Sequence, residues 1–145
     1  MSETSNFEYE IKLVKKDNYK FEVDFGDAIP KLLMDESTDV PGGEGKGPTA
    51  SFLLATAVGN CLSASFTFCL SKKKVALVSL KTKVRFKRER NEQGFWRISK
   101  IDVDLFPEVE NENDKNFERC VEIFKNYCIV SMSVEQGIDI EVTVK

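Results

Sequence analysis

The chain has 145 residues, a formal net charge of −3 and a charged fraction of 31%, which fits a single globular domain with its own core. Because the small net charge is negative, we expect no general affinity for nucleic acid. The chain has four cysteines, no histidine and no C-x-x-C spacing, so we expect no zinc site, no other metal and no cofactor.

The first twelve residues, MSETSNFEYEIK, are polar and acidic, unlike a signal peptide. Without an export signal, the four cysteines are expected to be reduced thiols in the cytoplasm rather than a disulfide framework. The uncharged run 48–71 is long enough to cross a bilayer, but it contains many small polar residues. We therefore expect the central helix of a soluble protein, with no membrane contact.

The N-terminal part predicts two strands and a long loop. Residues 8–14 and 19–25 have the composition of strands on either side of a turn at 16–18. Residues 27–47 are rich in glycine and proline and are expected to be loop-like. A loop of this length is unusual for a simple connection, which indicates function or contact with a partner subunit.

A long helix is predicted after this loop. Thr49 is a candidate N-cap, with Pro48 just ahead of it, and the apolar run that follows carries Cys61 and Cys69. Because this run is apolar nearly all round, we expect the helix to be buried at the centre of the fold.

A β-hairpin is predicted next. In its first strand, residues 75–88, apolar and basic side chains alternate along much of the length. A turn at 91–94 leads into a second strand, 95–106, whose alternation slips at Ser99, as a β-bulge would cause. Pro107 is expected to end that strand.

The C-terminal part predicts one helix and one strand. Asn113 or Asp114 can cap a helix that runs to about Cys128, with apolar residues at helical spacing. After Gly137, isoleucine and valine alternate with polar residues, which predicts a last strand. The element order is β-β-α-β-β-α-β, an α+β fold with antiparallel sheets in one domain over residues 1–145.

The cysteines are spaced in a way that limits how they can pair. Cys61 and Cys69 are eight residues apart, as are Cys120 and Cys128. Eight helical residues span about 12 Å, whereas a disulfide needs Cα atoms within about 7 Å, so any bridge must cross between helices. Antiparallel helices would bring Cys61 near Cys128, and parallel helices would bring it near Cys120. In a further interpretation all four cysteines are small apolar core residues.

Two cysteine-bearing segments form a recognisable pattern. One is the glycine-rich loop 42–49 with the helical segment 53–61, which ends at Cys61; the other is 126–131, around Cys128. In these segments, and in element order over nearly the whole chain, the sequence resembles the OsmC/Ohr family of osmotically inducible and organic hydroperoxide resistance proteins. The resemblance implies an OsmC-like α+β fold in an intertwined homodimer, whose sheets enclose the long central helices.

The same resemblance implies a cysteine-based hydroperoxide reductase. The catalytic residues would be Cys61 and Cys128. The peroxidatic cysteine, matching Cys61, attacks the hydroperoxide substrate and becomes a sulfenic acid. The resolving cysteine, matching Cys128, then forms a disulfide, which an external dithiol reductant reduces. The alternative is a non-catalytic small-molecule-binding or stress-related protein that uses the same inter-subunit pocket.

The chain departs from the family pattern in the charged groups that activate the first cysteine. The best-studied peroxidase branch of the family has a glutamate early in the long helix, where this chain has Ala50-Ser51-Phe52. That branch also uses an N-terminal arginine, whereas the first arginine here is Arg85. Glu44 and Lys46 of the glycine-rich loop, or an N-terminal lysine, are candidates to supply the missing charge.

Overall fold

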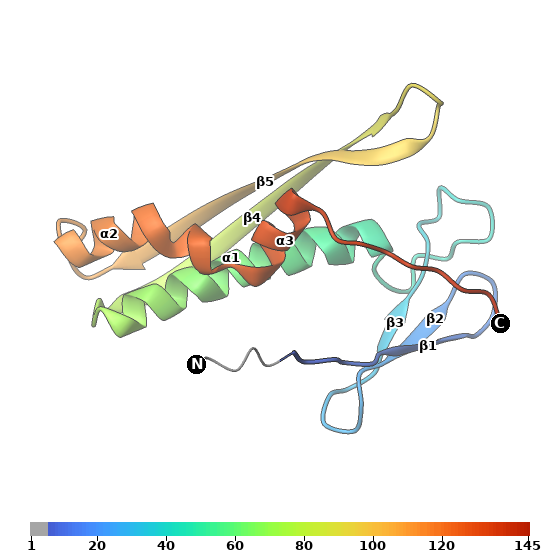
Figure 1. Ribbon diagram of the computed structural model, residues 1–145, viewed down its shortest axis with the longest axis horizontal. Helices are drawn as coiled ribbons and strands as arrows, with labels where there is room; N and C mark the ends of the chain where they lie inside the picture. The colour runs from blue at the N-terminus through green and yellow to red at the C-terminus, as the bar shows by residue number, and fades with distance from the viewer. Residues whose placement is uncertain (1–5) are drawn as a thin grey trace. The chain divides into compact units, whose positions relative to one another are not determined.

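The computed structural model describes residues 6–145 (Figure 1). Residues 1–5, the start of the polar segment predicted not to be a signal peptide, lie outside the described residues. The chain divides between Leu53 and Leu54 into two compact units, and each is described by itself. Helices and antiparallel sheets are both present, so the predicted α+β class is confirmed.

The first unit contains a three-stranded antiparallel sheet. Strand β1 (Lys12–Lys15) pairs with β2 (Phe21–Asp24), which also pairs with β3 (Leu32–Met34). The hairpin of β1 and β2 was predicted, although β1 begins later than expected. Strand β3 lies inside residues 27–47, which were predicted to be loop-like throughout. Three residues are too few to show an alternating pattern, so pairing with β2 is what makes this segment a strand.

The glycine-rich loop after β3 is held by one buried carboxylate. Asp35 is 3% exposed, and its side chain accepts three backbone hydrogen bonds, from Glu36 (2.7 Å), Glu44 (3.3 Å) and Lys46 (3.0 Å). A methyl group at Gly43 would overlap the backbone carbonyl of Ser37. The glycines therefore allow the chain to fold tightly around the Asp35 carboxylate, which is a packing role.

Helix α1 (Ala50–Lys72) is the long helix predicted from the apolar run. Thr49 caps it as expected, because its hydroxyl oxygen accepts the backbone N–H of Phe52 at 3.2 Å. Among the described helices, α1 alone is long and apolar enough to cross a membrane, with a mean hydropathy of 1.6 over its most apolar window. It also supplies buried residues to both hydrophobic clusters of the second unit, as the core helix of a soluble protein does.

Strands β4 (Leu77–Arg90) and β5 (Trp96–Val109) form a long antiparallel ribbon that runs alongside α1 (Figure 1). Their pairing shifts where Ser99 is skipped, so the predicted bulge is confirmed. The prediction that Pro107 ends the second strand is wrong, because Pro107 pairs with Leu80 inside β5. Within its sheet β5 has only β4 as a neighbour, and an edge strand tolerates proline where its missing N–H faces the open side.

The segment predicted as one helix up to Cys128 forms three short helices. They are α2 (Lys115–Ile123), the 3-10 helix η1 (Phe124–Tyr127) and α3 (Ile129–Gln136). Asp114 caps α2, as predicted, by accepting the backbone N–H of Asn116 at 2.8 Å. The helical path breaks at Cys128, whose backbone is extended (φ −82°, ψ 104°), and a new helix starts from it.

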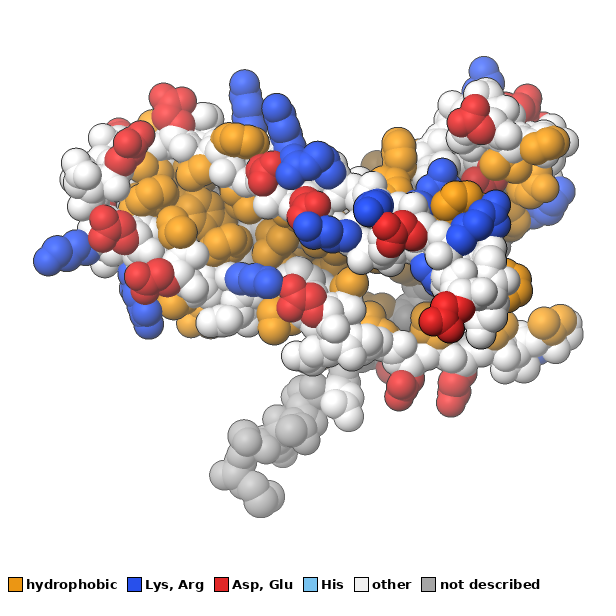
Figure 2. Space-filling model, turned by 90° about the horizontal axis from the view of Figure 1, so that it is seen from above, with side chains coloured by type: hydrophobic (Ala, Val, Ile, Leu, Met, Phe, Trp, Pro, Cys, Tyr) orange, Lys and Arg blue, Asp and Glu red, His pale blue; other side chains and the backbone are white. Residues whose placement is uncertain are grey.

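The last predicted strand is not formed within this chain. Residues 138–145 carry the expected alternation, but they pair with no strand among the described residues. Their apolar side chains, Ile138, Ile140, Val142 and Val144, are 64% to 95% exposed. Other large apolar side chains are also at the surface, where they appear orange in Figure 2. A strand needs a neighbour to satisfy its backbone, and alternation in the sequence does not supply that neighbour.

Candidate functional site

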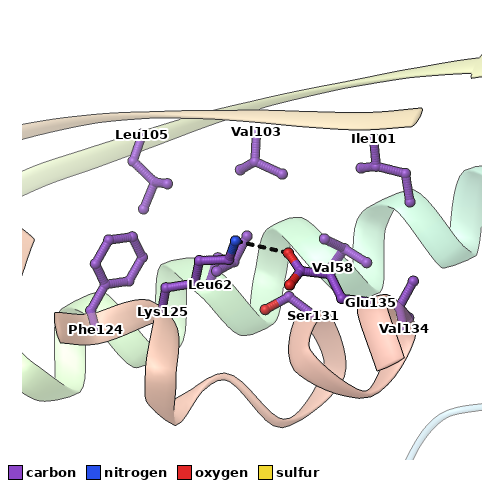
Figure 3. A pocket seen from close by; sticks show the side chains of 10 residues that line it. All are labelled: Val58, Leu62, Ile101, Val103, Leu105, Phe124, Lys125, Ser131, Val134 and Glu135. Atoms are coloured by element: carbon purple, nitrogen blue, oxygen red, sulfur yellow. Dashed lines mark ion pairs between the residues drawn. The ribbon is translucent and has the colours of Figure 1, made fainter. Parts of the chain in front are cut away.

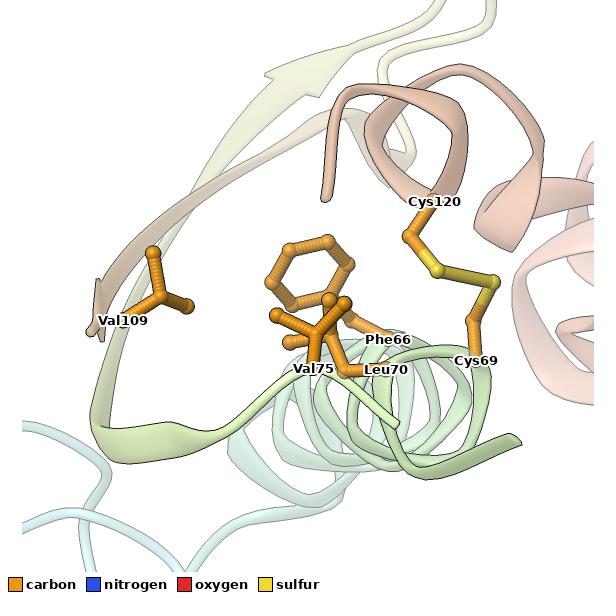
Figure 4. Packing of buried hydrophobic residues seen from close by; sticks show 6 residues of the cluster. All are labelled: Phe66, Cys69, Leu70, Val75, Val109 and Cys120. Carbon is orange, nitrogen blue, oxygen red and sulfur yellow. A yellow bond between two sulfur atoms is a disulfide. The ribbon is translucent and has the colours of Figure 1, made fainter. Parts of the chain in front are cut away.

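Helices α1 and α2 each contribute one cysteine to a disulfide. Cys69 and Cys120 are bridged, with their Cα atoms 5.8 Å apart, inside a hydrophobic cluster that also contains Phe66 and Leu70 (Figure 4). This corrects the expectation that all four cysteines are reduced thiols. Both cysteines are buried where the two helices meet, so the bridge crosses between helices, as the spacing required.

The bridge fixes which of the remaining cysteines face each other. With Cys69 opposite Cys120, an antiparallel course places Cys61 opposite Cys128, two helical turns away along α1. Cys61 packs against a second hydrophobic cluster, which consists of Val58, Leu62 and Cys128. The antiparallel alternative from the sequence is therefore the one the structure adopts, and it brings the two free cysteines together.

The two free sulfurs have different surroundings. Cys61 lies in the middle of α1 and is partly exposed, whereas Cys128 is 1% exposed at the junction of η1 and α3. Cys128 is also the N-cap of α3, and its sulfur accepts the backbone N–H of Ser131 at 3.4 Å. Cysteine takes the place that serine, threonine, asparagine or aspartate usually holds at a helix start.

This cap position changes the acidity of Cys128. Burial is the largest single influence and raises its pKa, because a charged sulfur loses solvation. The polar groups near the sulfur act in the opposite direction: they are the Ser131 hydroxyl, the Cys61 thiol, the Ser131 backbone N–H and the Ser65 hydroxyl. Together they bring the pKa of Cys128 below its ordinary value. The lowered pKa follows from the start of helix α3 and from three polar side chains around the Cys128 sulfur.

An apolar cavity of about 340 Å³ shares Val58 and Leu62 with the cluster that contains Cys128, although neither Cys61 nor Cys128 lines it (Figure 3). Val58 and Leu62 of α1, which flank Cys61 in the sequence, line it together with Ile101, Val103 and Leu105 of β5. Phe124 and Val134 complete its apolar lining, and Lys125 and Glu135 form a 2.8 Å ion pair beside it. The cavity therefore suits a ligand with an apolar body and room for one polar end.

Ser131 also lines this cavity. Its hydroxyl is buried and has no hydrogen-bond partner of good geometry in the described part of the chain. It still lies close enough to Cys128 to contribute to the lowering of the pKa of that thiol. Sequence reasoning missed Ser131 and Ser65. The sequence did contain a sign of the Ser131 contact. Ser131 follows Cys128 by three residues, which is the spacing between an N-cap residue and the backbone N–H that it accepts.

The charged loop residues considered as activators have other contacts. Glu44 forms an ion pair with Lys20. The backbone of Lys46 donates to Asp35 within the same loop. Both contacts lie in the first unit and fit the ordinary role of solvated loop charge.

A family model described as OsmC-like protein matches residues 43–143 of the chain. No curated protein sequence matches it. The family match covers both Cys61 and Cys128.

Solved structures with the same fold cover nearly the whole chain. An OsmC-like protein of unknown function from Vibrio cholerae has a TM-score of 0.76 at 16% identity, covering 90% of this chain and 95% of its own. An OsmC-like protein from Mycoplasma pneumoniae has a TM-score of 0.74 at 14% identity, with 90% and 89% covered. An organic hydroperoxide resistance protein OsmC from Legionella pneumophila has a TM-score of 0.66 at 18% identity, with 94% and 95% covered. At these identities the likeness establishes the fold.

Proposed function

The chain belongs to the OsmC-like family, and from this premise we propose that it reduces organic hydroperoxides with a pair of cysteines. Cys61 is the peroxidatic residue, and Cys128 is the resolving residue. The observation that carries the proposal is the packing of Cys61 against the hydrophobic cluster that contains Cys128, next to an apolar cavity. We further propose that residues 1–145 work as one OsmC-like domain.

The reaction starts from one thiol and one thiolate. The Cys61 sulfur attacks the terminal oxygen of ROOH, the O–O bond breaks, and the alkoxide leaves as ROH after taking a proton. Cys61 is then a sulfenic acid. The Cys128 sulfur attacks the Cys61 sulfur and expels hydroxide, which gives the disulfide. Two electrons pass from the two sulfurs to the peroxide bond, and the products are ROH, hydroxide and one disulfide.

The exposure of the two cysteines supports one direction for the reductive step. Cys128 is almost fully buried, whereas Cys61 is partly exposed. An external dithiol therefore attacks the Cys61 sulfur of the disulfide and releases Cys128 as the leaving thiolate. A sulfur whose pKa is lowered is the better leaving group, which favours this direction.

The proposal is tested by mixing the reduced protein with cumene hydroperoxide and a dithiol reductant. We expect catalytic loss of the peroxide, and a Cys61–Cys128 disulfide in peptides mapped after one equivalent of peroxide. Hydrogen peroxide should react more slowly, because it has no apolar group to occupy the cavity. If the Cys61 thiol is oxidised no faster than free cysteine and no such disulfide forms, the enzyme proposal fails. The non-catalytic binding protein then becomes the better interpretation.

We also propose that the protein is a cytoplasmic homodimer. The exposed alternation of residues 138–145 is that of a strand without its neighbour, and a second copy can provide a sheet edge for it. Static light scattering at micromolar concentration should give twice the 16.5 kDa mass of the chain. Truncation after Gly137 should shift the particle toward the monomer. A monomeric mass for the full chain would contradict the proposal.

A further inference from the structure

One buried polar side chain in the cavity lining lacks a partner. Ser131 is 5% exposed, and its hydroxyl has no hydrogen-bond partner of good geometry among residues 6–145. In Figure 3 its oxygen points into the space that the labelled side chains enclose. A buried hydroxyl without a partner costs free energy, so buried polar groups are nearly always hydrogen-bonded. The position of Ser131 in a cavity wall therefore indicates that a bound molecule supplies the missing partner.

The walls on the other sides of the cavity are apolar. They are formed by side chains of α1, β5 and η1, among them Leu62, Val103 and Phe124. The volume of about 340 Å³ is roughly twice that of an engineered apolar cavity that binds benzene, which is about 150 Å³. A molecule with an apolar body and one hydrogen-bonding end would satisfy both the walls and the Ser131 hydroxyl.

Ser131 also links this polar end of the cavity to the cysteine site. Neither cysteine of the proposed catalytic pair lines the cavity. However, the backbone N–H of Ser131 donates to the Cys128 sulfur at 3.4 Å. A head group held by the Ser131 hydroxyl is therefore next to the residue that contacts Cys128.

The charges in the lining select against an anionic head group. The two charged residues that line the cavity are Lys125 and Glu135, and they form a 2.8 Å ion pair with each other. Lys125 is thus already paired, and Glu135 would repel a second carboxylate. A carboxylate entering the cavity would lose hydration without gaining a free cation. The lining therefore suits a head group without charge.

We propose that this cavity binds an uncharged molecule with an apolar body and a terminal O–H group, and that Ser131 determines this specificity. Two hydroxyl groups suit each other because each can donate and accept a hydrogen bond. Alcohols and hydroperoxides share this head group. Only the identification of the ligand as the substrate ROOH and the product ROH rests on the proposed function, because binding itself needs no reaction.

The test compares three ligands that share one apolar body. They are 2-phenyl-2-propanol with a hydroxyl, cumene with no polar group and 2-methyl-2-phenylpropanoate with a carboxylate. Each is titrated by ligand-observed NMR into the full chain at micromolar concentration, so that the partner subunit of the proposed homodimer is present. We expect saturable binding of the alcohol and at least tenfold weaker binding of the carboxylate. The absence of alcohol binding, as when the partner subunit fills the cavity, would overturn the inference, as would equal affinity for the carboxylate.

Ser131→Ala tests the hydroxyl directly. The affinity for the alcohol should fall about fivefold, which is the contribution of one neutral hydrogen bond, while the affinity for cumene should not fall. Ser133→Ala is the matched control, because Ser133 is on the same helix and does not line the cavity. It should leave the affinity for the alcohol within about twofold of the parent value, the scale of a hydrogen bond that is not lost. Equal changes for the alcohol and cumene in Ser131→Ala would overturn the role of Ser131.

A second variant tests the charge argument while Ser131 stays in place. Glu135→Gln leaves Lys125 without its carboxylate partner. The affinity for 2-methyl-2-phenylpropanoate should then rise about fivefold, because the free ammonium group can donate to the carboxylate of the ligand. An unchanged affinity would overturn the selection against anions.

These measurements separate the inference from the proposed function. Alcohol binding that depends on Ser131, without peroxide turnover, would refute the peroxidase and leave the inference intact. Peroxide turnover by a protein whose affinity for the alcohol is the same with and without the Ser131 hydroxyl would do the reverse.

Discussion

Replacing Cys61 with serine should abolish turnover of an organic hydroperoxide. A serine oxygen is a far poorer nucleophile than a thiolate at neutral pH, so the first step stops. Cys128→Ser should behave differently. Its Cys61 is still oxidised, but the sulfenic acid has no resolving partner and proceeds to the sulfinic and sulfonic acids. Peroxide consumption and the mass of the intact protein distinguish the two variants.

The matched control for these variants is the other cysteine pair. Cys69→Ser combined with Cys120→Ser removes a bridge between residues 51 apart in the chain. In the chain-entropy model this lowers the free energy of unfolding by about 4 kcal/mol, which urea denaturation measures. Turnover by the folded variant should remain, because this pair lies about 12 Å from the reacting sulfurs along the helix. Complete loss of turnover in a variant that is still folded would contradict the assignment of the site to Cys61 and Cys128.

Replacing Gly59 with valine should destabilise the second unit strongly. Gly59 is buried on the face of α1 that meets β4, and a methyl group built there would overlap the side chain of Val84. Nearby, the hydroxyls of Ser63 and Thr82 form a 2.6 Å hydrogen bond between the same helix and strand. Overpacking of a well-filled contact typically costs 1–3 kcal/mol, so we expect a loss of about 3 kcal/mol in the free energy of unfolding.

Asn60→Val is the matched control for this effect. It adds the same side chain one position further along α1, where the residue is exposed, and asparagine and valine have similar helix propensities. Its midpoint in urea should stay close to that of the parent protein. Equal destabilisation by both substitutions would show that helix propensity, and not the contact with Val84, sets the cost. Because Cys61 is two residues away, Gly59→Val should also weaken its contact with Cys128.

The spacing of the cysteines in the sequence predicted only part of how they pair. The spacing of Cys61, Cys69, Cys120 and Cys128 excluded bridges along a helix and left an antiparallel and a parallel pairing open. The resemblance to the OsmC/Ohr family favoured the contact between Cys61 and Cys128, which the structure contains. Neither the spacing nor the resemblance indicated the bridge between Cys69 and Cys120. That bridge depends on two buried helix faces meeting, which is a property of packing.

The hydrogen bond that the Cys128 sulfur accepts could not be predicted from the sequence. One continuous helix up to Cys128 was expected, and in such a helix the Cys128 sulfur would have had no free N–H group to accept from. The actual break after η1 leaves the first N–H groups of α3 unpaired, and the Cys128 sulfur takes one of them. Cysteine is not among the preferred N-cap residues, so its presence at position 128 did not predict the start of a helix.

Local patterns determined the elements that depend on local chemistry. The caps at Thr49 and Asp114, the long apolar helix and the bulge at Ser99 all follow from side chains that act on their near neighbours in the chain. The tertiary structure decided the features that need a distant partner. Strand β3 exists because β2 pairs with it, and β5 continues through Pro107 because its far edge is open. Residues 138–145 have a strand's alternation but pair with no strand in the part of the chain that the structure describes, because hydrogen bonds between strands join residues that the sequence alone does not bring together.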